Sequence, residues 1–83
     1  MRNIAVITGN HKEYREFIRS YRCVDYKYFY VDRVEELYGW ERKLEYVLYG
    51  TYRERTDFRD IWDRLHIIAG RDLTSATMLY IKL

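Results

Sequence analysis

Two short loop sequences contain the residue types that could bind an anion. Residues 9–13 read GNHKE and residues 50–54 read GTYRE, so each runs from a glycine through a small polar residue, an aromatic ring and a base to a glutamate. Glycine lets the backbone turn tightly and approach a ligand closely. Basic side chains and the free N–H groups of a helix N-terminus attract negative charge. The pattern therefore predicts a site for a phosphate, a carboxylate or an acidic side chain.

The candidate binding edge combines these two loops with the residues that flank them. It consists of Thr8, Gly9, Asn10, His11, Lys12, Gly50, Thr51, Tyr52, Arg53 and Arg55. A purely structural role competes with this interpretation, because ordinary turns between a strand and a helix also contain a glycine and a capping residue. The sequence contains neither the dinucleotide-binding pattern GxGxxG nor the GK[ST] of a P-loop.

The other residues with reactive side chains form no pattern typical of an enzyme or a metal site. His11 and His66 lie far apart in the sequence, and neither has the spacing of a zinc ligand relative to Cys23. Ser20 and Ser75 lack the glycine-flanked turn that exposes a nucleophilic serine. We therefore predict that the protein is not an enzyme and that it has no catalytic residue, no cofactor and no metal.

Length and composition indicate one small globular domain. The chain has 83 residues, of which 48% are hydrophobic and 34% charged, a balance typical of folded domains. The net charge of +2 is too small to favour nucleic acid or a membrane surface as a partner. No apolar run approaches the ~18 residues that cross a bilayer, and the first apolar run is too short for a signal peptide. A single cysteine, Cys23, fits a reducing compartment, so we expect a cytoplasmic protein.

Tyrosine is unusually frequent, with ten residues in the chain. A tyrosine ring packs well, while its hydroxyl seeks water or a polar partner. Tyrosines are commonly found on half-buried sheet faces and edges, which is the simpler interpretation. The alternative is a tyrosine-rich recognition surface, because rigid aromatic rings provide contact area at low entropic cost.

Hydrophobic spacing predicts alternating strands and helices in the first part of the chain. The apolar run 4–7 is typical of a strand that is buried on both faces. Asn10 is a candidate N-cap, and Glu13 is placed to reach back to the N–H of that cap residue. Apolar residues at positions 14, 17, 18 and 21 predict one face of a helix that ends near residues 22–23. The aromatic segment 26–31 predicts an edge strand.

A second capped turn and a third strand follow. Asp32 is a candidate cap for a short helix over residues 33–38, with Glu35 at its third position and Gly39 directly after it. The β-prone run 44–49 predicts the third strand.

The last third of the chain predicts one more helix and an apolar tail. Thr56 and Asp57 are candidate caps for a helix whose apolar residues recur at positions 58, 61, 62, 65 and 68, and Gly70 directly follows it. Residues 71–77 are mostly polar, whereas residues 78–83 are apolar and β-prone. We expect this tail to form either a fourth strand beside the third or an arm that joins two copies into a homodimer, with a slight preference for the arm.

Three strand–helix units in succession are the signature of an α/β domain with a parallel sheet. We predict a small Rossmann-like or flavodoxin-like three-layer domain with strand order 2-1-3 and a possible fourth, C-terminal strand. Residues 1–70 form its βαβαβα part, and residues 71–83 a strand or arm of the same domain. Ligands of such sheets bind beyond the carboxyl ends of the strands, where the strand order reverses. That position lies between the first and third strands, where the candidate binding edge is placed.

Two segments resemble small uncharacterised proteins of bacteriophages. They are ITGN at residues 7–10 and the YGTxxER pattern at residues 49–55, and the likeness extends over roughly residues 3–66. Phage proteins of this kind look like orphan mini-Rossmann domains. The resemblance implies expression in the cytoplasm of a host cell and implies no established activity.

Small size, the lack of a catalytic set and the many tyrosines favour a non-enzymatic protein that binds a host or phage protein. The alternative is a module that binds a nucleotide or another phosphate ligand at the edge between the first and third strands. A third hypothesis, single-stranded nucleic acid stacked on tyrosines beside Lys27, Arg53 and Arg55, is disfavoured by the low net charge.

Overall fold

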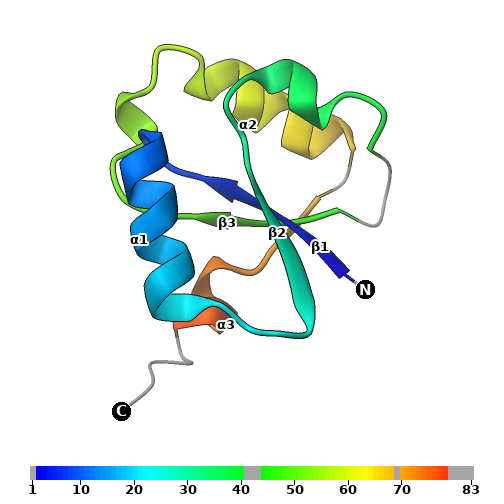
Figure 1. The fold of residues 1–83 in the computed structure, drawn as a ribbon. Coiled ribbons are helices and arrows are strands. Elements are labelled where there is room, and N and C mark those ends of the chain that lie inside the picture. Colours follow the sequence, from blue (N-terminus) through cyan, green and yellow to red (C-terminus); the bar gives the residue numbers. More distant parts are fainter. Residues whose placement is uncertain (1, 41–43, 69, 79–83) are drawn as a thin grey trace.

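Strand β1 (Arg2–Ile7) lies in the interior of a parallel sheet, between β2 (Tyr26–Tyr30) and β3 (Glu45–Leu48). The computed structural model describes residues 2–40, 44–68 and 70–78 (Figure 1). A short strand, β4 (Arg71–Asp72), pairs in parallel with β3, so the strand order is β2-β1-β3-β4. The α/β class and the order of the first three strands confirm the sequence prediction.

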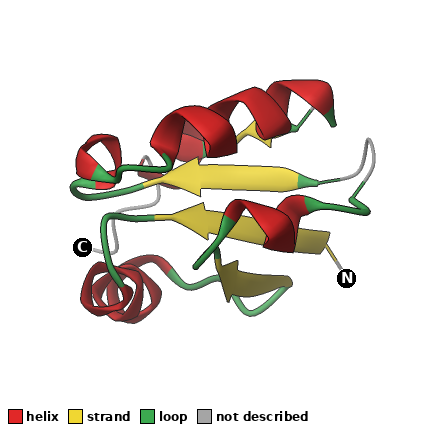
Figure 2. Cartoon of the chain, turned by 90° about the horizontal axis from the view of Figure 1, so that it is seen from above, coloured by secondary structure: helices red, strands yellow, loops and turns green. Residues whose placement is uncertain are grey.

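Helices cover both faces of this sheet and create three layers (Figure 1). Helix α1 (His11–Tyr21) and the short α3 (Thr74–Met78) lie on one face. Helix α2 (Phe58–Ile67) and the 3-10 turn η1 (Val34–Leu37) lie on the other. The view turned by 90° looks onto the sheet and shows the strands side by side, with α2 and η1 in front of them (Figure 2). A second 3-10 turn, η2 (Tyr52–Glu54), connects β3 to α2.

The side chains of β1 form the centre of two cores. Ile4 and Val6 belong to the core under α1, together with the fully buried Phe17. Ala5 and Ile7 alternate with them and belong to the larger core under α2. Because successive side chains of a strand point to opposite faces, a strand covered on both faces must be apolar throughout. This requirement explains the continuous apolar run that predicted a central strand.

Helix α1 begins where the sequence predicts. The Asn10 side chain caps it by accepting a hydrogen bond from the Glu13 N–H at 2.9 Å. The helix ends at Tyr21, with Arg22 as its C-cap.

The short helix after β2 differs from the prediction in type and in capping. It is the 3-10 turn η1, and Glu36 rather than Glu35 accepts hydrogen bonds from the N–H groups of Asp32 and Arg33, at 3.0 and 3.1 Å. Leu37 is fully buried, and the half-buried Val34 packs on the same core. Residues three apart share one side of a 3-10 turn, so burying both apolar residues sets the phase of the turn and moves the cap by one position.

The fourth strand lies beside β3 as predicted, but it is formed by other residues. The N–H groups of Arg71 and Leu73 donate to the carbonyls of Leu44 and Tyr46, at 3.1 and 2.8 Å. Met78 belongs to helix α3, so the expectation of a strand starting at Met78 is wrong; residues 79–83 lie outside the described residues.

A local hydrogen bond explains why the chain turns helical after β4. The Asp72 carboxylate accepts a hydrogen bond from the Thr74 N–H at 2.8 Å, the interaction by which aspartate starts a helical turn. Leu73, between them, is buried in the core under α1. Leu73 thereby anchors residues 71–77 to the core, although the mostly polar composition of this segment is typical of a linker.

Candidate functional site

The two predicted loops meet at the carboxyl ends of β1 and β3. A Cβ atom placed on Gly9 would lie 2.1 Å from the Thr51 hydroxyl oxygen and 2.9 Å from the Thr51 carbonyl oxygen. Only glycine permits this approach of one loop to the other. Gly50 has a different requirement, because its φ of +70° lies in the left-handed region that side chains disfavour.

The Glu13 carboxylate fills the space between the loops. It accepts hydrogen bonds from the Gly9 N–H at 2.7 Å, from the Thr51 N–H at 3.0 Å and from the Thr51 hydroxyl at 2.9 Å. We expected this side chain to reach back to the N–H of Asn10, and it bonds to Gly9 and to the second loop instead. The donors that made this edge a candidate anion site therefore already bind a carboxylate of the same chain.

The pKa of Glu13 reflects this arrangement. Partial burial by itself would raise the pKa of the Glu13 carboxyl, but the hydrogen bonds from Thr51 and Gly9 outweigh that effect and lower it. The carboxylate is consequently held in its charged form, as a fixed negative group at the centre of the edge.

Arg55 connects the ends of three elements and has no donor left for a ligand. Its side chain is only 8% exposed. The guanidinium donates to the carbonyls of Thr8, Val31 and Asp32 at 3.1, 2.6 and 2.7 Å, and to the two carboxylate oxygens of Asp57 at 2.9 and 3.1 Å. A guanidinium has five N–H donors, and these five bonds use all of them. Arg55 therefore ties the carboxyl ends of β1 and β2 to the segment before α2.

Asp57 stands at the N-cap position of α2, as predicted, but its side chain makes no capping hydrogen bond. The ion pair with Arg55 occupies its carboxylate instead.

Other residues of the predicted edge also serve the fold. Thr8 is fully buried and donates its hydroxyl proton to the Asn10 carbonyl at 2.6 Å. The His11 ring packs on Tyr14 and Tyr30, with ring centres 5.6 and 5.1 Å away.

The second loop contributes in the same way. Tyr52 packs on Phe58, with ring centres 5.3 Å apart, and the Arg53 guanidinium lies 5.7 Å from the centre of the Tyr52 ring. Lys12 and Arg53 are exposed. Of the charged side chains predicted at this edge, these two point to solvent, while Arg55 does not.

No family model, no curated protein and no solved structure matches this chain. Within residues 2–40, 44–68 and 70–78, no cluster of three or more histidine, cysteine, aspartate or glutamate side chains could hold a metal ion. No helix of that part of the chain is long and apolar enough to cross a membrane.

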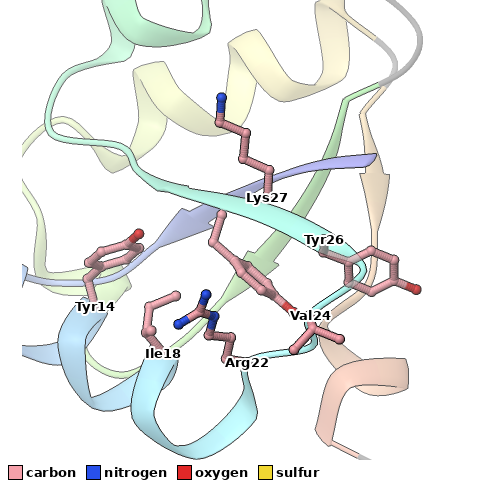
Figure 3. A pocket seen from close by; sticks show the side chains of 7 residues that line it. Tyr14, Ile18, Arg22, Val24, Tyr26 and Lys27 are labelled. Carbon is pink, nitrogen blue, oxygen red and sulfur yellow. The ribbon is translucent and has the colours of Figure 1, made fainter. Parts of the chain in front are cut away.

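A groove of about 330 Å³ lies between α1 and β2, away from the predicted edge (Figure 3). Its lining consists of Tyr14, Ile18, Arg22, Val24, Tyr26, Lys27 and Tyr28. Figure 3 shows Ile18 and Arg22 extending from α1 toward β2, whereas the Lys27 side chain points to the opposite side of the strand. Val24 is 80% exposed and contributes aliphatic surface to the lining of the groove.

Arg22 supplies a positive charge inside this aromatic groove. Burial raises the pKa of the Tyr14 and Tyr28 hydroxyls, and the nearby Arg22 guanidinium partly opposes the rise in both. Arg22 makes no ion pair with any described residue. The groove thus presents tyrosine rings, aliphatic surface and one unneutralised cation.

Strand β2 borders the groove and is the last strand on its side of the sheet among the described residues. The Val31 N–H donates to the Val6 carbonyl. Successive residues of a strand direct their backbone N–H and C=O groups to alternate sides. The backbone groups of Phe29 and Lys27 therefore point toward β1, as that of Val31 does. Tyr28 and Tyr30 then direct their N–H groups outward, so this edge offers hydrogen-bonding groups to another chain.

Sequence reasoning identified β2 as an edge strand but did not identify the groove beside it. One signal was present in the spacing of Lys12, Arg15, Arg19 and Arg22. These positions are separated by three, four and three residues, which places their side chains along one side of a helix. The last of these four residues, Arg22, lines the groove.

Proposed function

We propose that this protein is a non-enzymatic module that binds another protein. In line with the phage resemblance of ITGN and YGTxxER, its partner would be a host or phage protein met in the cytoplasm of the host cell. The proposal rests on one observation above all, the open edge of β2 beside a groove with tyrosine, aliphatic and arginine side chains.

Two physical arguments support this assignment. A free strand edge is a template for pairing with another polypeptide, and proteins commonly use it to add a strand from a partner. Aromatic side chains and arginine are the types most enriched at the energetic centres of protein interfaces.

The alternative function, binding of a nucleotide or phosphate at the edge between β1 and β3, has no specific observation in its favour. Glu13 occupies the loop donors, and Arg55 uses every guanidinium N–H within the chain. A phosphate entering this edge would meet a fixed carboxylate, which repels it.

Affinity capture with the purified chain tests the proposal. The immobilised protein is expected to enrich the same protein repeatedly from a lysate of the organism that carries the gene, and the recombinant partner should then bind in a purified mixture. Nucleotides should neither be turned over nor raise the melting temperature. The melting temperature is a sensitive test, because a nucleotide that binds would stabilise the fold by about 2.7 kcal/mol at 100 times its Kd. Absence of any reproducible partner, or a nucleotide-induced shift of that size, would argue against a protein-binding role.

The homodimer expected from the C-terminal segment remains a separate proposal. Light scattering of the full chain and of a chain lacking residues 79–83 measures it. A dimeric parent that becomes monomeric after the deletion supports the arm, and a monomeric parent excludes it.

A further inference from the structure

We propose that the groove between α1 and β2 binds an extended acidic segment of the partner, which pairs with β2 as an additional strand. This inference rests on the proposed protein-binding function and names the chemistry and the position of the partner. It combines the free backbone edge of β2, the apolar and aromatic groove beside it, and the basic side of α1.

The backbone of β2 favours a polypeptide as the occupant. The outward N–H groups of Tyr28 and Tyr30 repeat at the interval of an extended chain. A peptide strand offers carbonyls at the same interval, so it can satisfy both donors at once. A nucleic acid strand has no such ladder of donors and acceptors, although its bases could stack on tyrosine rings.

The side chains beside β2 favour a particular composition. On the α1 face, an added strand would place alternate side chains next to Tyr26, Tyr28 and Ile18, where apolar groups are buried most favourably. On the opposite face, its neighbour would be Lys27. Opposite charges on neighbouring strands attract each other, so a carboxylate fits that position.

The charges on α1 strengthen the case for an acidic partner. Lys12, Arg15, Arg19 and Arg22 are all exposed and make no ion pair with a described residue. They lie along one side of α1 and its C-cap, and Arg22, the C-cap residue, lines the groove. The glutamates of α1, Glu13 and Glu16, lie on the side toward β3, since Glu13 bonds to Thr51 and both influence the pKa of Tyr49. Of these four bases, Arg22 lines the groove, so an acidic strand beside β2 would meet a cation there that is unpaired among the described residues.

A second copy of this chain suits the edge less well. Pairing two β2 strands would bring two copies of Lys27 and Arg22 close together. Like charges on adjacent strands are destabilising, and lysine on an edge strand is a common means of preventing self-association.

A selection of short random peptides displayed against the purified protein tests the inference. The enriched peptides are expected to alternate apolar residues with aspartate or glutamate and to lack proline. The best peptide, synthesised with a fluorescent label, should bind the protein in an anisotropy titration. Its binding should weaken as the sodium chloride concentration is raised, because salt screens the attraction between the acidic residues of the peptide and the basic side chains of the protein.

Matched variants place the binding site. Arg22→Glu should weaken binding by roughly tenfold, whereas Arg59→Glu, the same charge change on an exposed residue of α2, should leave it within a factor of about two. Tyr28→Pro removes the outward N–H together with the ring, and Tyr28→Ala removes the ring alone. Weaker binding by the proline variant than by the alanine variant isolates the backbone hydrogen bond, provided that circular dichroism shows both variants folded.

Several outcomes would overturn the inference. Enriched peptides without an excess of acidic residues, or peptides that bind Arg22→Glu as well as the parent, exclude the acidic strand. If a single-stranded oligonucleotide binds the parent and its affinity falls in these variants as much as that of the peptide, the groove is a site for nucleic acid instead. A parent dimer that Tyr28→Pro dissociates assigns it to a second copy. If lysate capture yields a partner that binds all variants equally, the protein-binding function stands and only this site is wrong; if neither capture nor selection yields a binder, both fail.

Discussion

The Glu13 carboxylate accepts hydrogen bonds from both the backbone N–H and the hydroxyl of Thr51, a residue 38 positions further along the chain. This contact joins the start of α1 to the loop after β3. It converts the loops that resemble an anion site into an internal connection, in which the anion belongs to the protein.

Glu13→Gln should destabilise the protein at neutral pH by about 1 kcal/mol, because the charged acceptor of three hydrogen bonds is lost. The pKa of Glu13 is lowered in the folded protein, so its stabilisation is present above the ordinary glutamate pKa and disappears as pH falls through the folded value. The difference between parent and variant should therefore be largest above the ordinary glutamate pKa of about 4.3 and shrink as pH falls through the lowered pKa of the folded protein.

Urea denaturation across this pH range measures the effect. Glu16→Gln is the matched control, since it removes a carboxylate from the same helix without a contact to Thr51. A difference between parent and Glu13→Gln that stays constant with pH would contradict the role of the charge.

Arg55→Lys should lower the free energy of unfolding by roughly 3 kcal/mol despite keeping the positive charge. An ammonium has three donors on one atom and cannot reach the separate carbonyls of Thr8, Val31 and Asp32 together with Asp57. Chemical denaturation compares this variant with Arg53→Lys, which changes an exposed arginine in the same loop and should be nearly neutral. Similar stability for the two variants would show that the buried fork of Arg55 contributes little.

Gly50→Val should damage the protein more than Gly39→Ala. Both glycines have positive φ values, +70° and +85°, so each substitution introduces backbone strain. A Cβ on Gly50 would additionally lie 2.5 Å from a carboxylate oxygen of Glu13, whereas none of the described atoms lies within 4 Å of a Cβ on Gly39. We expect a loss of about 1 kcal/mol for Gly39→Ala and clearly more for Gly50→Val. Thermal unfolding of both variants decides, and equal melting temperatures would contradict the packing of Glu13 against Gly50.

Thr74→Val should destabilise the protein by about 1–2 kcal/mol while preserving the size of the side chain. The Thr74 hydroxyl accepts a hydrogen bond from the Leu48 N–H at 2.9 Å, and so continues the pairing of β3 beyond the two residues of β4. Thr74→Ser retains the hydroxyl and is expected to stay close to the parent. Amide hydrogen exchange at Leu48 should accelerate in the valine variant only; unchanged protection would show that the hydroxyl is not the partner of this N–H.

Local features of the sequence determined the framework of this protein. The apolar run 4–7 required a strand buried on both faces, and the Asn10 cap with apolar positions 14, 17, 18 and 21 required helix α1. These signals depend on neighbours within one turn or one strand, so they can be interpreted without the fold. Glu35 and Glu36 could each accept the capping hydrogen bonds at the start of η1. The burial of Val34 and Leu37 sets the phase of the turn and so selects Glu36.

The role of each polar residue was decided by the tertiary structure alone. Glu13 reads as a local capping residue and Arg55 as a free cation, because their actual partners lie on other elements of the chain. The brief strand β4 depends on carbonyls that only β3 supplies. The groove likewise exists only because α1 and β2 lie side by side at the open edge of the sheet. Periodicity reports which side of an element is buried, whereas a polar contact depends on distances that folding creates.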